Sequence, residues 1–162
     1  MPAYLKDQEY MDHVGHLIDT KKVQRLGEIT HHYHSTRLEH SINVSYTSYK
    51  LAKKLGWDAK STARGGLLHD LFYYDWRDTK FNKSHAWIHP RIAVRNAQKV
   101  KTLNKIEKDI IVKHMFGATV APPRYKESWI VTCVDKYWAV REATLPWQHK
   151  WKNRKILRLK IP

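Results

Sequence analysis

The chain has 162 residues, 42% of them hydrophobic and 12% aromatic, a composition that is typical of one globular domain and excludes a disordered chain. No apolar run approaches the roughly 18 to 20 residues that span a bilayer, and residues 1–10 lack the apolar stretch of a secretory signal. Because Cys133 is the single cysteine, an intrachain disulfide is excluded, and we expect a soluble protein of the cytoplasm with no membrane partner.

The net charge of +15 favours anionic partners, although a solvated basic surface is an equally simple interpretation. Part of the charge is local, because no acidic residue follows Glu142 and the tail 143–162 is rich in lysine and arginine. Apolar residues at 156, 157, 159 and 161 indicate that this tail docks on the domain or on a second subunit. The charge suits an anionic substrate, a phosphate or nucleic acid; we favour nucleic acid less, and the tail allows for a homo-oligomer.

Helical signals dominate the middle of the chain. Thr36 with Glu39 three residues later forms a capping box, which predicts a helix that continues until Gly56 stops it. Asp58 can cap a second helix, which we expect to run through Leu71 because apolar residues recur at helical spacing. Residues 75–88 are mixed and aromatic, and we expect a loop there.

The second half is predicted to be helical as well. The His89-Pro90 pair is expected to start a short helix, because proline is well tolerated at the first helical position. Asn104 with Glu107 gives a second capping box, and a last long helix is expected over about 127–142. Strand signals are nearly absent, with no convincing alternation and no hairpin turn. The fold class is therefore predicted to be all-α.

Polar residues stand where these helices should be apolar. Asp135 falls in the same stripe as Val131 and Trp138, and His114 extends the row of Ile106 and Ile110. A buried carboxylate is costly unless it is paired, hydrogen-bonded or bound to a metal. Each of four predicted helices offers one or two such groups: His40, His69, Asp70, His114 and Asp135.

This pattern is how a helical bundle builds a metal site in its core. Imidazole and carboxylate ligands together suit Fe, Mn, Zn or Co, and the lack of cysteine ligands argues against a structural thiolate zinc site. A single buried histidine is more often a hydrogen-bonded core residue than a ligand. The ordered set, with His69 directly followed by Asp70, weakens that simpler interpretation.

The same residues resemble the defining pattern of the HD superfamily of metal-dependent phosphohydrolases. The segment 37–41 (Arg-Leu-Glu-His-Ser) is similar to the opening helix of that family, 66–70 (Gly-Leu-Leu-His-Asp) to its central motif, and 134–136 (Val-Asp-Lys) to its closing one. The resemblance covers roughly residues 35–142. It implies a single HD domain over 1–162, a helical bundle with the metal site in its core, to which the charge distribution adds the basic tail over 143–162.

Two further histidines between Asp70 and Asp135 resemble the two-metal, six-ligand subgroup, which includes the symmetric diadenosine tetraphosphate hydrolases. The segment 72–77 (Phe-Tyr-Tyr-Asp-Trp-Arg) departs from those enzymes and looks more like an uncharacterised bacterial HD group. The resemblance implies that Asp70 bridges two divalent transition metals, with Fe or Mn favoured and Zn, Co or Ni allowed. His85 is an alternative to His89 as a ligand. The implied set is His40, His69, Asp70 and Asp135 for one metal and His89 and His114 for the second.

The resemblance further implies hydrolysis of a phosphate ester or anhydride, with a nucleotide as the favoured substrate, by attack of a metal-bound hydroxide. Asp70 and His69 would be the catalytic residues. Arg37, Arg77 and Lys136 are the basic residues nearest the motifs, and we expect them to bind phosphate. Two alternatives remain at this point: a di-iron oxygenase of the HD type, and a non-catalytic basic module that binds a nucleotide or nucleic acid.

Overall fold

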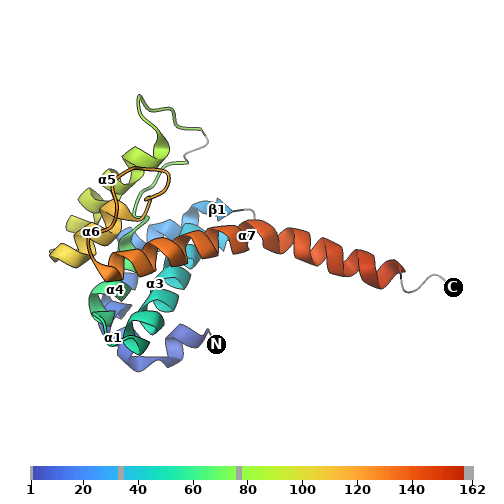
Figure 1. Cartoon of the computed structure of the whole chain (residues 1–162), viewed down its shortest axis with the longest axis horizontal. Helices are drawn as coiled ribbons and strands as arrows, with labels where there is room; N and C mark the ends of the chain where they lie inside the picture. Colours follow the sequence, from blue (N-terminus) through green and yellow to red (C-terminus); the bar gives the residue numbers. More distant parts are fainter. Residues whose placement is uncertain (1, 33–34, 76–77, 159–162) are drawn as a thin grey trace.

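The computed structural model describes residues 2–32, 35–75 and 78–158, and for residues 30–32 and 145–158 it describes the backbone alone. The first elements are η1 (Ala3–Lys6), α1 (Gln8–Ile18), α2 (Lys21–Gln24) and η2 (Arg25–Glu28). The main helices follow: α3 (Arg37–Lys54), α4 (Ala59–Leu68), α5 (His85–Gln98), α6 (Lys105–Lys113) and α7 (Lys126–Arg158). The all-α prediction is confirmed (Figure 1).

The helices begin where their capping residues predict. The side chain of Thr36 accepts from the N–H of Glu39, and the Glu39 carboxylate accepts from the N–H of Thr36, so both halves of the capping box are present. Asn104 and Glu107 repeat this arrangement at α6. At the other end of α3, Gly56 takes a φ of 67°, a left-handed conformation that glycine adopts without steric cost.

Two helix boundaries differ from the prediction at the centre of the chain. The helix α4 ends at Leu68, so Leu71 lies beyond it, and α5 begins at His85 rather than at His89. The N–H groups of Trp87 and Ile88 both donate to the carbonyl of Ser84, which closes the first turn of α5. Pro90 therefore lies in the second turn. The rule that proline starts a helix placed this boundary too late.

The ends of the predicted bundle also differ. Strand β1 (Thr30–His32) pairs antiparallel with β2 (Ser35–Thr36), although no hairpin was predicted. Strands of three and two residues are too short to show an alternating pattern in the sequence. The helix α7 also continues beyond the predicted end at 142, to Arg158.

Within the described residues, no helix combines the length and apolar character needed to cross a membrane.

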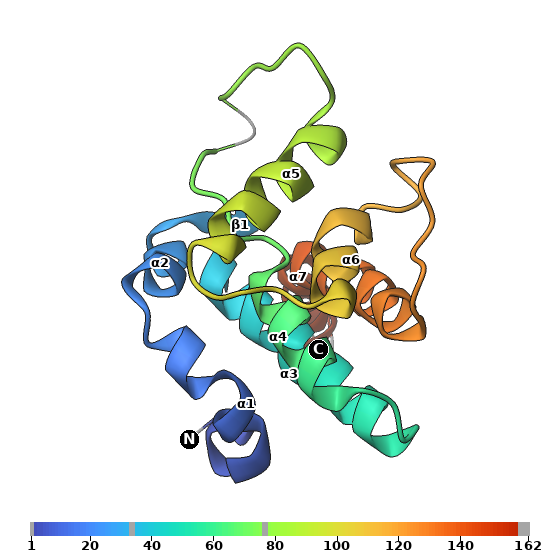
Figure 2. The ribbon, with the colours of Figure 1, turned by 90° about the vertical axis from the view of Figure 1, so that its left-hand side faces the viewer.

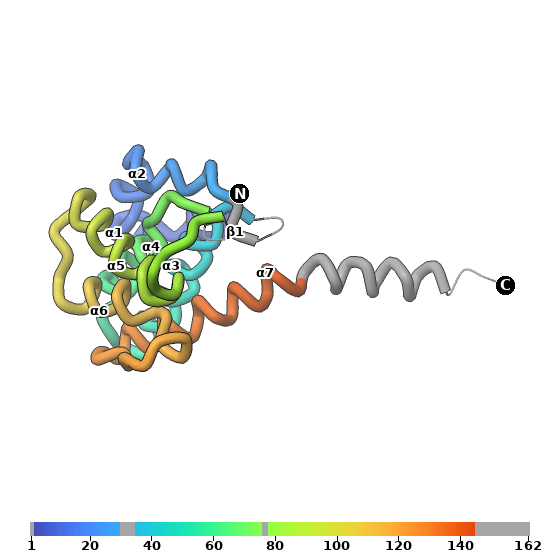
Figure 3. Tube along the Cα trace, turned by 90° about the horizontal axis from the view of Figure 1, so that it is seen from above, coloured from blue at the N-terminus to red at the C-terminus, as the bar shows by residue number. Residues whose placement is uncertain are grey.

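The pair α3 and α4 forms the centre of the fold. Figures 2 and 3 show α1 on one side of this pair and α6 and α7 on the other. One core cluster packs α1, α3, α4, α5 and α6 together around Tyr10, Leu67 and Ile111, and a smaller one joins α3, α6 and α7 around Val44 and Val131. The hydroxyl of Ser45 on α3 donates to the Ala63 carbonyl of α4 at 2.6 Å, which holds the central pair together.

Close approach of α3 and α4 depends on Gly66, three residues before His69. A Cβ at position 66 would lie 3.0 Å from the backbone Cα of Ser45, so the two helices would have to move apart. We expect Gly66→Ala to lower the free energy of unfolding by about 1–3 kcal/mol, as overpacked cores do. Urea denaturation followed by circular dichroism measures this difference.

Gly15→Ala is the matched control, because it is also a helical glycine. A Cβ there meets only the flexible end of the Met11 side chain, at 3.3 Å. We expect this variant to be unchanged or to gain up to about 1 kcal/mol from the helix propensity of alanine. Equal stability of the two variants would contradict the proposed close packing of α3 on α4.

Candidate metal centre

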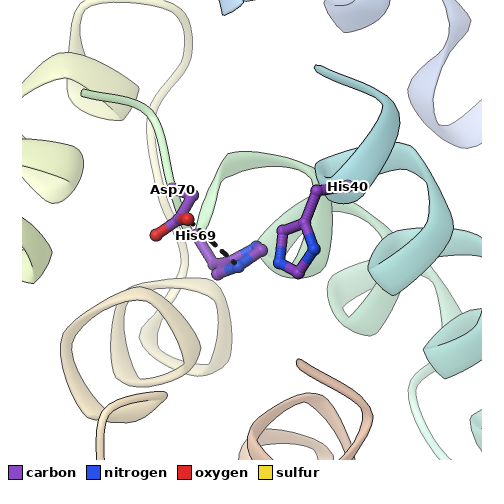
Figure 4. Close-up of side chains that lie close together, drawn as sticks. All are labelled: His40, His69 and Asp70. Atoms are coloured by element: carbon purple, nitrogen blue, oxygen red, sulfur yellow. Dashed lines mark ion pairs between the residues drawn. The ribbon is translucent and has the colours of Figure 1, made fainter. Parts of the chain in front are cut away.

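The six predicted ligands come together where several helices meet. His40 lies in the first turn of α3, His69 follows the last residue of α4, and His114 follows the last residue of α6. His89 lies on α5 and Asp135 on α7. All six are buried, and none is more than 9% exposed. Figure 4 shows the His69 ring between His40 and the Asp70 carboxylate.

The ends of two helices favour positive charge at this place. In both α4 and α6 the residue that follows the last helical residue is a histidine of the cluster, so the partial negative charge of each helix C-terminus lies at the site. The N-terminus of α3 is also near, but its capping box already supplies the Glu39 carboxylate. The backbone ends at α4 and α6 therefore add to the attraction of the carboxylates for a cation.

One group of ligand atoms surrounds Asp135. Its Oδ1 lies 3.0 Å from Nε2 of His40 and 3.4 Å from Nε2 of His69. On the other side of His69, Oδ2 of Asp70 lies 3.9 Å from the same Nε2. This group therefore combines two imidazoles with carboxylates from two different elements.

A second group surrounds the other oxygen of Asp70. Its Oδ1 lies 3.3 Å from Nε2 of His89 and 3.5 Å from Nε2 of His114. The two oxygens of Asp70 thus face different sets of histidines. A carboxylate in this position could bridge two ions, which is the role that the family resemblance implies for Asp70.

The tautomers of three histidines follow from their backbone contacts. Nδ1 of His69, His89 and His114 lies within 3.0 Å of a backbone carbonyl oxygen, at Gly66, His85 and Ile111 in that order. A carbonyl oxygen can only accept, so each Nδ1 carries the proton and donates it. In the neutral ring, Nε2 then keeps its lone pair, and this is the nitrogen that points into the cluster.

Two of these lone pairs face each other closely. Nε2 of His89 and Nε2 of His114 are 2.7 Å apart, yet in the neutral rings neither carries a proton that it could donate. Nε2 of His69 is also fully buried and has no hydrogen-bond partner. Such an arrangement is stable with a cation among the nitrogens, so the residues fit a metal ion. The cluster offers three sets of ligand atoms within 4.8 Å of one another: His40-His69-Asp70, His69-His114-Asp135 and Asp70-His89-His114.

The protonation states of the two carboxylates and of His114 agree with ligand chemistry, whereas burial lowers the pKa values of His40 and His69 but the carboxylates that face these rings outweigh it and raise them. Burial alone would raise the pKa of Asp70 and of Asp135, but the histidines that face them lower both pKa values below the ordinary value, so both remain carboxylates. Burial lowers the pKa of His114, which favours the neutral ring. For His40 burial also acts downward, but hydrogen bonds to Asp135 and Glu142 outweigh it and raise the pKa to about 10.

His85, the alternative to His89, lies one turn earlier on α5. Its ring stacks on His89 with centroids 4.4 Å apart, and its Nδ1 is 3.3 Å from the Tyr74 hydroxyl. Burial lowers the pKa of His85 to about 4. Among the described residues, His89 belongs to a set of converging ligand atoms and His85 does not.

The three basic residues predicted to bind phosphate lie in different surroundings. Arg37 is buried; its Nη1 donates to the Phe72 carbonyl at 2.7 Å, and its guanidinium stacks on the Phe72 ring. Lys136 donates to the carbonyl of His114 at 3.1 Å. Arg77 lies outside the described residues. Arg37 and Lys136 thus contact backbone that carries the cluster, and their binding of phosphate stays a prediction.

Glu142 is a residue of the site that the motifs did not single out. Its carboxylate is buried and lies 3.2 Å from Nδ1 of His40. A signal was present in the sequence, because Glu142 follows Asp135 by seven residues, which is two helical turns and therefore the same face of α7.

Comparison with known proteins identifies a family over most of the chain. The model of the HD domain family matches residues 37–155. Ribonuclease Y of Mesoplasma florum is 30% identical over 104 residues, which cover 61% of this chain and 20% of that protein. The chain therefore spans about a fifth of the length of this curated relative. No solved structure matches the chain significantly.

The contrast between His89 and His85 can be measured directly. If the cluster binds metal, we expect His89→Ala to lower the metal content, because Nε2 of His89 converges with the other ligand atoms of the cluster. His85→Ala keeps the backbone carbonyl that orients His89, so we expect it to keep its metal. Metal content by mass spectrometry after reconstitution with Mn²⁺ compares the two variants. Full content in His89→Ala together with a loss in His85→Ala would reverse the assignment.

Proposed function

Because this chain belongs to the HD domain family, we propose that it is a metal-dependent phosphohydrolase that cleaves a phosphate ester or anhydride, with a nucleotide as its substrate class. The family consists generally of metal-dependent hydrolases, which gives the coarser part of the proposal. The finer part, phosphorus chemistry on a nucleotide, rests on the HD pattern of the residues and on the arrangement of the cluster.

The observation that carries the proposal is the position of Asp70 between two groups of histidines. Its Oδ2 faces His69 and its Oδ1 faces His89 and His114. This arrangement supports a centre of two ions that share one carboxylate. We propose His40, His69, Asp70 and Asp135 for one ion and Asp70, His89 and His114 for the other, with Fe or Mn as the metals. Asp70 and His69 are the proposed catalytic residues.

When bound, divalent metals of this kind lower the pKa of the water that they coordinate toward neutral values, and they neutralise charge on phosphoryl oxygens. The protein residues supply the fixed geometry that this chemistry needs. Backbone carbonyls orient the rings of His69, His89 and His114, and Arg37 ties the segment after Asp70 to α3. The net charge of +15 would raise the local concentration of an anionic substrate.

The named relative supports phosphorus chemistry in a limited way. A ribonuclease, by its name, acts on RNA, so that protein is consistent with cleavage of a phosphate ester by an HD domain. This chain covers a fifth of that protein, and we propose a small nucleotide rather than RNA as the substrate.

A screen for phosphate or nucleotide release tests the proposal. We expect hydrolysis that stops when EDTA removes the metal, returns with Mn²⁺ or Fe²⁺, and is the same with and without oxygen. Asp70→Asn should lower the rate by more than the roughly 10- to 100-fold that an outer-shell change costs. Asp109→Asn is the control, because Asp109 is also buried but accepts from the backbone N–H of Arg124.

Other outcomes would favour the alternatives. Activity that requires oxygen would favour a di-iron oxygenase. Nucleotide binding by the metal-loaded protein without turnover would favour a binding module. Full activity of Asp70→Asn would contradict the proposed centre itself.

The proposed bridging by Asp70 also predicts the number of ions. After reconstitution with Mn²⁺, or with Fe²⁺ under reducing conditions, the protein should hold about two ions per chain, as two-metal hydrolases do. Elemental analysis of the gel-filtered protein gives this number, and Asp70→Asn should lose most of both ions. A ceiling of one ion in the wild-type protein would reduce the centre to the four-ligand form.

A further inference from the structure

Glu142 is a buried carboxylate that contacts His40 on the side of the ring away from the other ligand atoms. Both of its oxygens are close to Nδ1 of His40, at 3.3 and 3.2 Å. The opposite ring nitrogen of His40, Nε2, faces Asp135 at 3.0 Å. Asp135 and Glu142 both belong to α7, so one helix contacts the two nitrogens of a single ring.

The short strand pair fixes Glu142 from the other side. The hydroxyl of Ser35, on β2, donates to Oε2 of Glu142 at 3.0 Å. The carboxylate is therefore held between the strand pair and the His40 ring rather than free to choose another rotamer. The result is a continuous chain of contacts from Ser35 through Glu142 and His40 to Asp135.

His40 differs from the other histidines of the cluster in this partner. His69, His89 and His114 place Nδ1 against neutral backbone carbonyls. His40 places Nδ1 against a carboxylate. A carboxylate on the remote nitrogen of a ligating histidine fixes its tautomer, orients its ring and makes the other nitrogen a stronger donor to the metal.

We infer that Glu142 is a positioning residue, which holds His40 with Nε2 toward the metal and strengthens it as a ligand. This inference rests on the proposed function, because it requires that the cluster binds a metal ion. It adds a residue outside the six-ligand pattern and gives the strand pair a role, since Ser35 orients Glu142.

Binding of Mn²⁺ alone, measured by the paramagnetic resonance signal of the free ion, tests the inference without an assay of activity. We expect Glu142→Gln to weaken Mn²⁺ binding by about 10- to 100-fold, the usual cost of losing an outer-shell partner. Glu127→Gln is the matched control. Glu127 is also a buried carboxylate of α7, but it accepts from the N–H of Asp58, at the start of α4. We expect this control to bind Mn²⁺ like the wild type.

A double-mutant cycle separates positioning from a merely structural role. If Glu142 acts through His40, then Glu142→Gln should weaken Mn²⁺ binding in the wild type but add nothing in His40→Ala. Ser35→Ala removes one hydroxyl at a half-buried position and should weaken binding by a smaller factor. It also tests the inference independently should Glu142→Gln fail to fold.

The outcomes distinguish this inference from the proposed function. Wild-type protein that does not bind Mn²⁺ would overturn the proposed function and this inference with it. Wild-type binding with unchanged affinity in Glu142→Gln, or an equal loss in the His40→Ala background, would overturn the inference alone. Unchanged affinity in Ser35→Ala would overturn it where Glu142→Gln does not fold.

Discussion

The burial of Asp70 is the constraint on which the rest of the site depends. A carboxylate in the interior of a helical bundle is costly unless opposite charge or hydrogen-bond donors surround it. Here each oxygen faces histidine nitrogens from different helices, so α4, α5 and α6 must all approach the same point. The packing of the bundle and the chemistry of the centre therefore impose the same requirement on the chain.

The elements that meet this requirement were predictable to different degrees. The starts of α3, α4 and α6 follow from capping side chains, which are local signals that few other structures satisfy. The start of α5 was predicted at His89, because a proline in the second turn imitates the signal of a first turn. The strand pair could not be predicted, since strands of three and two residues are too short to show an alternating pattern.

The candidate site shows the same division. The order and spacing of polar residues in apolar stripes predicted five of the clustered residues, and the family resemblance added His89. The structure brings all six together, while their binding of metal stays a prediction. The sequence could not predict that Arg37 contacts backbone carbonyls. Its partners, the carbonyls of Phe72 and Tyr74, are brought to it only by the fold. Glu142 was missed because no motif reaches it, although its spacing from Asp135 was visible.

The shared helix of Asp135 and Glu142 has a consequence for how this chain can vary. Each helical residue turns by about 100°, so deletion or insertion of one residue between positions 135 and 142 would move Glu142 to another face of α7 and away from His40. Between Asp70 and His85, the described residues 71–75 and 78–84 lie outside helices, and the length of that connection is not tied to such a register. Length variation among related chains is therefore expected after the HD pair and excluded between these two carboxylates.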